Sequence, residues 1–358
     1  MTGHRSVSRR RVLTGAGSLA VGGLAGCIGG PATSSPDTIR VGTYPAYVDA
    51  PSTSPGAWVK AEFERRHDAT LEWVAPDNEL TTFIQRRRQG APLEADLYLG
   101  VTPQHLVRAQ TELDQPLFEG FDVGAIDNAR DIQDVYHFDP KRRVLPIGAS
   151  YVAIVYDETA VDAPPTFASL TDPAYEDALL LPNPQSTTTG LLFLLWSIHT
   201  VGRDRYLEYW NRLMDNGVHV LGSWSSAYTA YSNAEASMVV SYSTDQVYAA
   251  NANADMSRHQ IAFLNDQGYA YVDGLGKFAT TERDDLVRRF AEFMLSPEVQ
   301  RKTAVKNVGI PAVSGVSLPE QFRQYAKVPE NPVQYPLDVL AAHMDEWRET
   351  WARRIVSG

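Results

Sequence analysis

The chain has 358 residues, of which 44% are hydrophobic, and this content is enough to fill the core of one large or two medium-sized domains. Its formal net charge of −11 argues against nucleic acid or an anionic membrane surface as the main partner, because a phosphate-binding protein needs a basic face. A cationic ligand fits this charge better. The single cysteine excludes an intramolecular disulfide and any metal site built from several cysteines.

The N-terminal segment has the features of an export signal. Arginines at 9–11 precede an apolar run of small residues at 12–25, and the sequence Leu-Ala-Gly-Cys ends at Cys27. Such a segment is too short to span a membrane and is typical of a secretory signal at residues 1–27. The paired arginines resemble a twin-arginine export signal, and Leu-Ala-Gly-Cys resembles a lipobox, in which the cysteine becomes the lipidated first residue of the mature protein.

Residues 28–37 are rich in Gly, Pro and Ser, so we expect a flexible tether there. Together with lipidation of Cys27, the tether predicts a globular body held at the extracellular face of the cell membrane. The alternative is a free cysteine in a cleaved peptide.

The acidic charge has a simpler explanation than a cationic ligand: lysines are rare beside arginines, and this balance resembles proteins of salt-loving organisms, whose acidic surfaces stay hydrated in brine.

Strands and helices alternate in the first part of the body. This alternation predicts a mainly parallel sheet with helices on both faces. A Pro- and Ser-rich loop is expected at 45–56 and mixed loop and short helix at 121–139. The periodicity predicts strands at 38–44, 71–74 and 96–100 and helices at 57–67, 80–89 and 103–110.

The second part begins with a long strand at 144–156 that we expect Gly148 to break. This strand and 269–278 are candidates for crossings between two lobes, and therefore for hinges. The final helix, 337–356, is expected to brace the first lobe. Further strands are predicted at 178–181, 218–221, 238–240 and 260–264 and helices at 188–200, 205–214, 284–294 and 296–306.

Motifs of catalysis are missing from the sequence. There is no nucleophile elbow, no His-Glu-x-x-His, no phosphate-binding loop and no dinucleotide glycine fingerprint. The histidines are scattered, with no pair at one-turn spacing. We therefore expect a binding protein, not an enzyme, with no cofactor and no metal site.

Three groups of residues are candidates for a binding site. Asn183–Gly190, NPQSTTTG, stands between a strand and an apolar helix, where hydroxyl and N–H groups can hold a hydroxyl or phosphate group. Ordinary helix capping is the alternative. From this segment the candidates are Ser186, Thr187, Thr188 and Gly190.

The second group lies in the stretch 222–249, which combines several aromatic rings with many hydroxyl groups. Trp224, Tyr242 and Tyr248 are candidates for stacking on a flat cation. Tyr228 and Tyr231 are instead expected to pack against the core.

The third group is Tyr44, at the end of a strand where parallel sheets bind ligands, with Asp77 and Asn78 in the next strand's loop. The two loop side chains could accept hydrogen bonds from an amino group. Ordinary solvated loop residues are the alternative.

At the level of a class, LLLPNPQSTTT at 179–189 and FAEFMLSPEVQ at 290–300 resemble substrate-binding components of ABC importers. The blocks NPQSTTTGLLFLLW, GSWSSAY and SYSTDQVY resemble, more specifically, the thiamine-binding receptors of this class over about residues 41–353. The resemblance implies an α/β, two-lobed periplasmic-binding-protein fold of type II. Each lobe would be a mainly parallel sheet flanked by helices, with the ligand cleft between the lobes. The implied lobes are 38–149 with 275–358, and 150–274.

The resemblance also implies roles and partners. Tyr44, Trp224, Tyr242 and Tyr248 would contact the thiamine rings, and Thr187 and its neighbours would hold the hydroxyethyl or phosphate end. Asn78 falls where the family has an acidic residue near the aminopyrimidine, and the acidic Asp77 is offset from that position by one residue. Two tryptophans of the family have no clear counterpart, one in 48–55 and one near Val308. The implied partners are thiamine or a thiamine phosphate and the permease and ATPase subunits of an ABC transporter.

Two alternatives remain open. Receptors for ferric iron share the fold and use paired tyrosines, which Tyr242 and Tyr248 could mimic, although Trp224 would have no use in an iron site. A secreted enzyme that modifies thiamine is the other. It would need a nucleophilic cysteine, and the body beyond Cys27 contains none.

Overall fold

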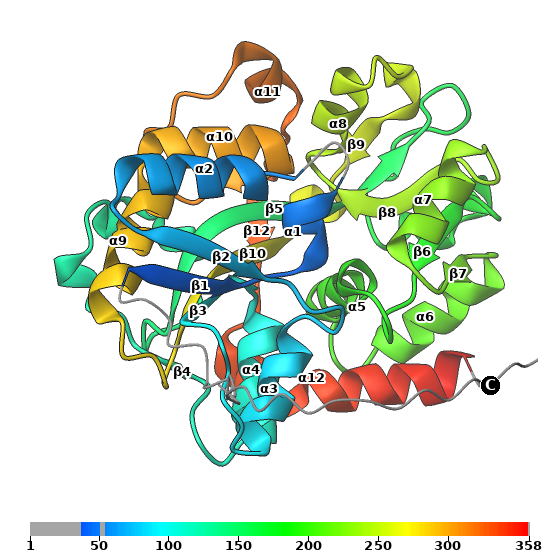
Figure 1. Ribbon diagram of the computed structural model, residues 1–358. Coiled ribbons are helices and arrows are strands. Elements are labelled where there is room, and N and C mark those ends of the chain that lie inside the picture. The colour runs from blue at the N-terminus through cyan, green and yellow to red at the C-terminus, as the bar shows by residue number, and fades with distance from the viewer. Residues whose placement is uncertain (1–36, 51–53, 357–358) are drawn as a thin grey trace, which may run out of the picture. The chain divides into compact units, whose positions relative to one another are not determined.

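A mixed sheet runs through the body of the computed structural model and joins two groups of parallel strands (Figure 1). The structure describes residues 37–50 and 54–356, so the predicted export signal, Cys27 and the tether up to residue 36 lie outside the described residues. The main path of the sheet follows the order β2-β1-β3-β10-β5-β8-β6-β7.

The first parallel group is formed by strands β1 (Thr38–Gly42), β2 (Thr70–Val74) and β3 (Leu97–Val101). All five residues of β3 are buried, as expected for a strand covered on both faces. Two separate hydrophobic clusters, one with Phe63 and the other with Phe83, cover these strands. The helices that supply them are α2 (Gly56–Arg66), α9 (Asp284–Leu295) and α10 (Pro297–Asn307) for the first, and α3 (Leu80–Arg88) and α4 (Pro103–Glu112) for the second.

The second parallel group consists of β6 (Leu179–Pro182), β7 (His219–Leu221) and β8 (Met238–Tyr242). Helix α5 (Thr188–Val201) is buried over most of its length and contacts β5, β6 and β8. Helices α6 (Tyr206–Asp215) and α7 (Trp224–Ser232) complete this part, with α7 packed on β6 and β8.

Two long antiparallel strands connect the groups, namely β5 (Val144–Tyr156) and β10 (Gln267–Phe278). The predicted break of β5 at Gly148 is wrong, because β5 is continuous. Its pairing with β10 is irregular beside Gly148, however: Asp273 pairs with Gly148 and Gly274 with Pro146, so Ile147 is an extra, bulged residue of β5. A Cβ atom at Gly274 would lie 2.3 Å from the Leu145 carbonyl oxygen, so only glycine permits this approach.

Helix α12 (Leu337–Trp351), continued by one wider turn at Ala352–Val356, does not simply brace the first parallel group. It contacts α4, but Trp351 is fully buried against Trp210 of α6, with ring centroids 5.3 Å apart. The helix therefore shares the hydrophobic core of the second group.

Several short elements complete the fold, some of them where the sequence predicted only loops. Pro45–Asp49 forms helix α1, which begins with proline at its first position. Within residues 37–50 and 54–356, no helix has the length and apolar character needed to cross a bilayer. The remaining short elements are β4 (Phe118–Glu119), α8 (Asp245–Asn251), β9 (Gln260–Ala262), β11 (Ile310–Pro311), α11 (Glu320–Tyr325), β12 (Asn331–Val333) and several single turns of 3-10 helix.

Candidate functional site

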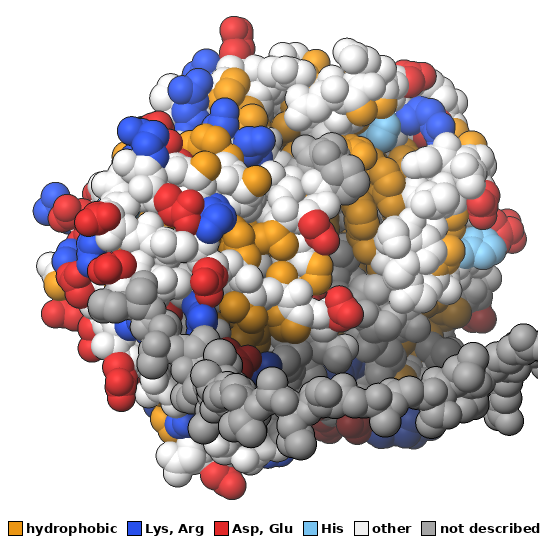
Figure 2. Space-filling view, in the orientation of Figure 1, with side chains coloured by type: hydrophobic (Ala, Val, Ile, Leu, Met, Phe, Trp, Pro, Cys, Tyr) orange, Lys and Arg blue, Asp and Glu red, His pale blue; other side chains and the backbone are white. Residues whose placement is uncertain are grey.

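The stretch 222–249 folds into α7, β8 and α8, and these elements line one side of a cavity of about 750 Å³. The N-terminus of α5 adds to the same side. The other contributions come from α1, from the turn before α3 and from the end of α10. Hydrophobic side chains gather along the middle of the face drawn in Figure 2, beside a hollow. A cavity of this size suits a small organic molecule.

Four aromatic residues of the cavity, Trp224, Tyr228, Tyr242 and Tyr248, form what we call the aromatic wall. The rings of Trp224 and Tyr228 stack with centroids 5.0 Å apart and an interplanar angle of 27°. The Trp224 Nε1–H donates to the Ser241 Oγ at 3.1 Å, which fixes the indole ring. Trp224 and Tyr248 remain 38% and 45% exposed, so both present ring surface to a ligand.

The prediction that Tyr231 packs in the core is confirmed, and Tyr228 packs against the edge of the same cluster but also lines the cavity. Tyr231 is 1% exposed and lies in a hydrophobic cluster. Tyr228 follows Trp224 by four residues on α7, so both rings share one helix face, and that face lines the cavity. The Tyr228 hydroxyl donates to Asp245 Oδ1 at 2.6 Å.

Asp245 is a functional candidate that sequence reasoning missed. It lines the cavity although it is only 7% exposed, and its Oδ2 lies 2.7 Å from His259 Nδ1. The only available signal was its position between Tyr242 and Tyr248, two residues that were themselves selected. It brings a carboxylate to the edge of the aromatic wall.

The segment 183–190 divides into residues that line the cavity and residues that support the turn. Thr187, Thr188 and Thr189 line the cavity. Thr187 Oγ1 also accepts from the Gly190 N–H at 3.1 Å, which caps α5. The buried Thr189, which was not selected, donates from Oγ1 to the Tyr242 hydroxyl at 2.8 Å. Burial raises the pKa of Tyr242, so its hydroxyl stays protonated.

Ser186 and Gly190 lie outside the cavity lining. The Ser186 Oγ donates to the Gly222 carbonyl oxygen at 2.8 Å, and this bond ties the turn before α5 to the turn before α7. A Cβ atom at Gly190 would lie 2.0 Å from the Pro182 carbonyl oxygen. Glycine is therefore required there for close packing of the α5 N-terminus.

Ala46, Glu79, Asn307 and Val308 form a second wall of the same cavity. Asp77 and Asn78 are exposed and lie outside the lining, whereas the neighbouring Glu79 is part of it. The acidic side chain is thus offset by one residue from the predicted Asn78. Partial removal from water raises the pKa of the Glu79 carboxyl.

Tyr44 also lies outside the cavity lining but touches the second wall. Its hydroxyl accepts a hydrogen bond from Asn307 Nδ2 at 3.1 Å. Burial, with the carboxyl of Asp273 as a smaller cause, raises the pKa of Tyr44 far above its ordinary value. The structure therefore places this ring behind Asn307.

Residues 58–330 match the family described as bacterial extracellular solute-binding protein. The chain belongs to this family. As a solute-binding protein it is similar to the thiamine-binding periplasmic protein of Salmonella typhimurium, with 27% identity over 326 residues that cover 91% of this chain and 95% of that protein.

Solved structures show the fold of this solute-binding protein. A periplasmic thiamin binding protein aligns with a TM-score of 0.72 and 24% identity, covering 89% of this chain and 96% of the other. Apo ferric ion-binding protein A of Pasteurella haemolytica aligns with a TM-score of 0.71 and 12% identity, covering 89% and 98%. The predicted α/β, type II periplasmic-binding-protein fold is confirmed.

Proposed function

We propose that this solute-binding protein is an extracellular receptor for thiamine or its phosphate esters. It closes around its ligand and delivers it to the permease of an ABC importer, and no bond is made or broken. Lipid attached to Cys27 would anchor it at the outer face of the membrane. The relatives named as thiamine-binding periplasmic proteins support this ligand, since they match nearly the whole chain.

The observation that carries the proposal is the composition of the cavity. Thiamine has two flat heteroaromatic rings and a permanent positive charge on one of them. The aromatic wall offers exposed ring faces, each worth about 0.5–2 kcal/mol on a cation, and Glu79 and Asp245 supply negative charge. Among the residues that line the cavity in the described structure, none is Lys or Arg.

The hydroxyl end of thiamine would lie at the N-terminus of α5, where Thr187 and Thr188 line the cavity. A diphosphate group would meet two carboxylates and no cationic side chain in the described lining. We therefore expect thiamine to bind more tightly than its diphosphate.

Calorimetry of the purified protein at high salt tests the ligand. Saturable heat is expected with thiamine, with weaker binding of the monophosphate and the weakest binding of the diphosphate. Absence of heat with all three ligands, together with tight uptake of ferric iron, would contradict the proposal.

The arrangement of Tyr242 favours ring stacking over iron binding. An iron ligand must be a phenolate, and burial raises the pKa of Tyr242, which disfavours this form in the unliganded site. The indole of Trp224, stacked on Tyr228, offers no metal ligand, and the Tyr228 hydroxyl donates to Asp245. Both observations support an aromatic ligand.

The anchor has a separate test. Cys27→Ser is expected to release the exported protein from membranes into the soluble fraction, because no acyl chain can be attached. Continued membrane association of this variant would remove the lipid anchor from the proposal and leave the ligand untouched.

A further inference from the structure

Asp273 on β10 is a buried carboxyl group that the contacts described so far do not use. It is 7% exposed. In the part of the chain that the structure describes, no other residue donates a hydrogen bond to its side chain, and no Lys or Arg pairs with it. Gly148 faces it across the β5–β10 pair, and a Cβ atom there would lie 3.1 Å from Asp273 Oδ1. The glycine leaves room for the carboxyl group.

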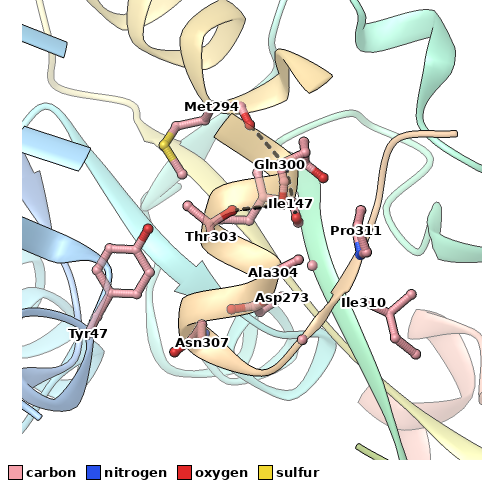
Figure 3. A pocket seen from close by; sticks show the side chains of 12 residues that line it. Tyr47, Ile147, Asp273, Met294, Gln300, Thr303, Ala304, Asn307, Ile310 and Pro311 are labelled. Atoms are coloured by element: carbon pink, nitrogen blue, oxygen red, sulfur yellow. Dashed lines mark hydrogen bonds between the residues drawn. The ribbon is translucent and has the colours of Figure 1, made fainter. Parts of the chain in front are cut away.

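Asp273 lines a small cavity of about 30 Å³ that adjoins the large one. Figure 3 shows this cavity lined by Tyr47 of α1, by Thr303 and Asn307 of α10, and by Asp273. Asn307 lines both cavities and therefore separates Asp273 from the ligand space. The Tyr47 hydroxyl is buried without a hydrogen-bond partner, so a polar occupant such as one water molecule suits the small cavity.

The register of the sheet places Asp273 on the face that underlies the large cavity. Side chains two residues apart on a strand point to the same face, so Asp273 and Tyr271 share one. Tyr271 is opposite Ser150, whose Oγ lies 3.4 Å from the Oγ1 of the cavity-lining Thr244. The Tyr271 ring also packs edge-on against Tyr242, with centroids 5.8 Å apart. A continuous layer of polar and aromatic side chains thus links Asp273 to the aromatic wall.

Among the residues that the structure describes, none places a positive charge beside Asp273. The titratable groups that its field reaches are the hydroxyls of Tyr44, Tyr47, Tyr242 and Tyr271, all of them neutral. Burial raises the pKa of Asp273 to about 7. An ionised carboxylate at this depth is costly unless a cation approaches it.

We propose that Asp273 is a specificity-determining residue, whose carboxylate, beneath Asn307, selects a ligand with a positively charged ring over a neutral ring of the same shape. The inference rests on the proposed function, because the thiazolium ring of thiamine carries such a charge. The ligand supplies the cation that the described protein does not place beside Asp273. Ionisation of Asp273 and binding of the cation then stabilise each other, so the affinity rises as the pH rises through 7.

Two ligands and three variants test the inference in the full-length protein purified in mild detergent. The ligands are thiamine and 3-deazathiamine, in which carbon replaces the charged ring nitrogen. For the wild type, the affinity for thiamine should rise about tenfold between pH 6 and pH 8, and that for the neutral analogue should stay constant. In Asp273→Asn, the pH dependence should vanish and the preference for thiamine over the analogue should fall about tenfold.

Asp273→Glu keeps the charge and should retain both the pH dependence and the preference, even if it binds more weakly. Tyr47→Phe is a matched control that removes a polar group from the small cavity without a change of charge, and it should leave both properties intact. The inference is overturned if Asp273→Asn weakens both ligands equally and keeps the wild-type pH profile. If the wild type binds neither ligand, the proposed function itself has failed.

Discussion

The two walls of the cavity differ in how well their own groups are satisfied. In the aromatic wall, Trp224 donates to Ser241, Tyr228 donates to Asp245, and the Tyr242 hydroxyl accepts from Thr189. The rings are thus held in place before any ligand arrives. The second wall is different, since Glu79 and Val308 both adopt left-handed backbone conformations, with φ of 48° and 52°.

Beneath the second wall lies Asp273, buried and without a hydrogen bond from another described residue. Strained backbone conformations such as those of Glu79 and Val308 are tolerated at functional sites when the surrounding fold imposes them. The aromatic wall thus provides pre-organised contact area, whereas the second wall contains strained backbone and covers the buried Asp273, whose ionisation a cationic ligand would favour. Substitutions in the aromatic wall should therefore mainly reduce ligand binding. Substitutions of Val308 in the second wall, and of Asp273 beneath it, should raise the stability of the unliganded protein.

The largest effect on binding is expected from Trp224→Ala. The lost stacking surface should weaken thiamine binding by about 1–3 kcal/mol, measured by calorimetry. The melting temperature should change little, because the side chain is 38% exposed. Tyr231→Phe, a change in the buried ring of the same helix outside the cavity, should leave the affinity unchanged. An unaltered affinity of Trp224→Ala would remove this ring from the site.

Asp273→Asn should change stability in a pH-dependent manner. Below the ordinary pKa of 3.8, the carboxyl is protonated in both folded and unfolded chains, so the substitution has little effect. Between 3.8 and about 7 the unfolded chain releases its proton and the folded chain keeps it, so the wild type loses stability as the pH rises. Above about pH 7 the folded chain has also released the proton, and the loss of stability is complete.

The variant avoids this loss, and its free energy of unfolding at pH 8 without ligand should exceed that of the wild type by roughly 1–3 kcal/mol. Denaturant unfolding at pH 4 and pH 8 measures the difference. A gain of equal size at both pH values would show that packing, and not ionisation, is responsible.

Val308→Gly should relieve the strain at the end of α10. Val308 caps this helix in a left-handed conformation, which a β-branched residue adopts only at a cost and which glycine adopts freely. The free energy of unfolding should rise by about 1 kcal/mol. Val308→Thr, which keeps the branched Cβ, should show no such gain. Equal stability of the two variants would mean that the site imposes no strain on Val308.

Glu79→Gln should have the smallest effect. Its carboxyl is at the exposed mouth of the cavity, where water and salt screen the charge, so thiamine affinity should fall by less than about 1 kcal/mol. The loss should disappear when binding is measured at molar salt. Asp77→Asn, which removes a charge two residues away outside the lining, is the control. A large loss that persists at high salt would make Glu79 a direct ligand contact.

Local sequence patterns were sufficient for most of the sheet and for much of the aromatic wall. Alternating and helical periodicity predicted the parallel groups, and the spacing of Trp224, Tyr242 and Tyr248 brought all three to one cavity, together with Thr187 and Thr188. Trp224, Tyr242 and Tyr248 lie on the consecutive elements α7, β8 and α8, so short-range patterns determine their directions.

The second wall could not be predicted in the same way, because its residues come from distant parts of the chain. Glu79 was missed because the sequence pointed to its neighbours Asp77 and Asn78, and its positive φ cannot be read from the local pattern. Asn307 enters the site through the end of α10, and nothing in its local sequence marks it. Tyr228 was assigned to the core because helical periodicity alone does not say which face meets a cavity.

The exposed indole of Trp224 gives the protein an internal optical reporter. The other six tryptophans are buried or partly buried, so Trp224 is the one whose emission depends most on what enters the cavity. A ligand ring stacked on it would quench that emission, and the neighbouring Tyr228 would transfer excitation to the same indole. Occupancy of the site can therefore be followed by fluorescence in the unlabelled protein.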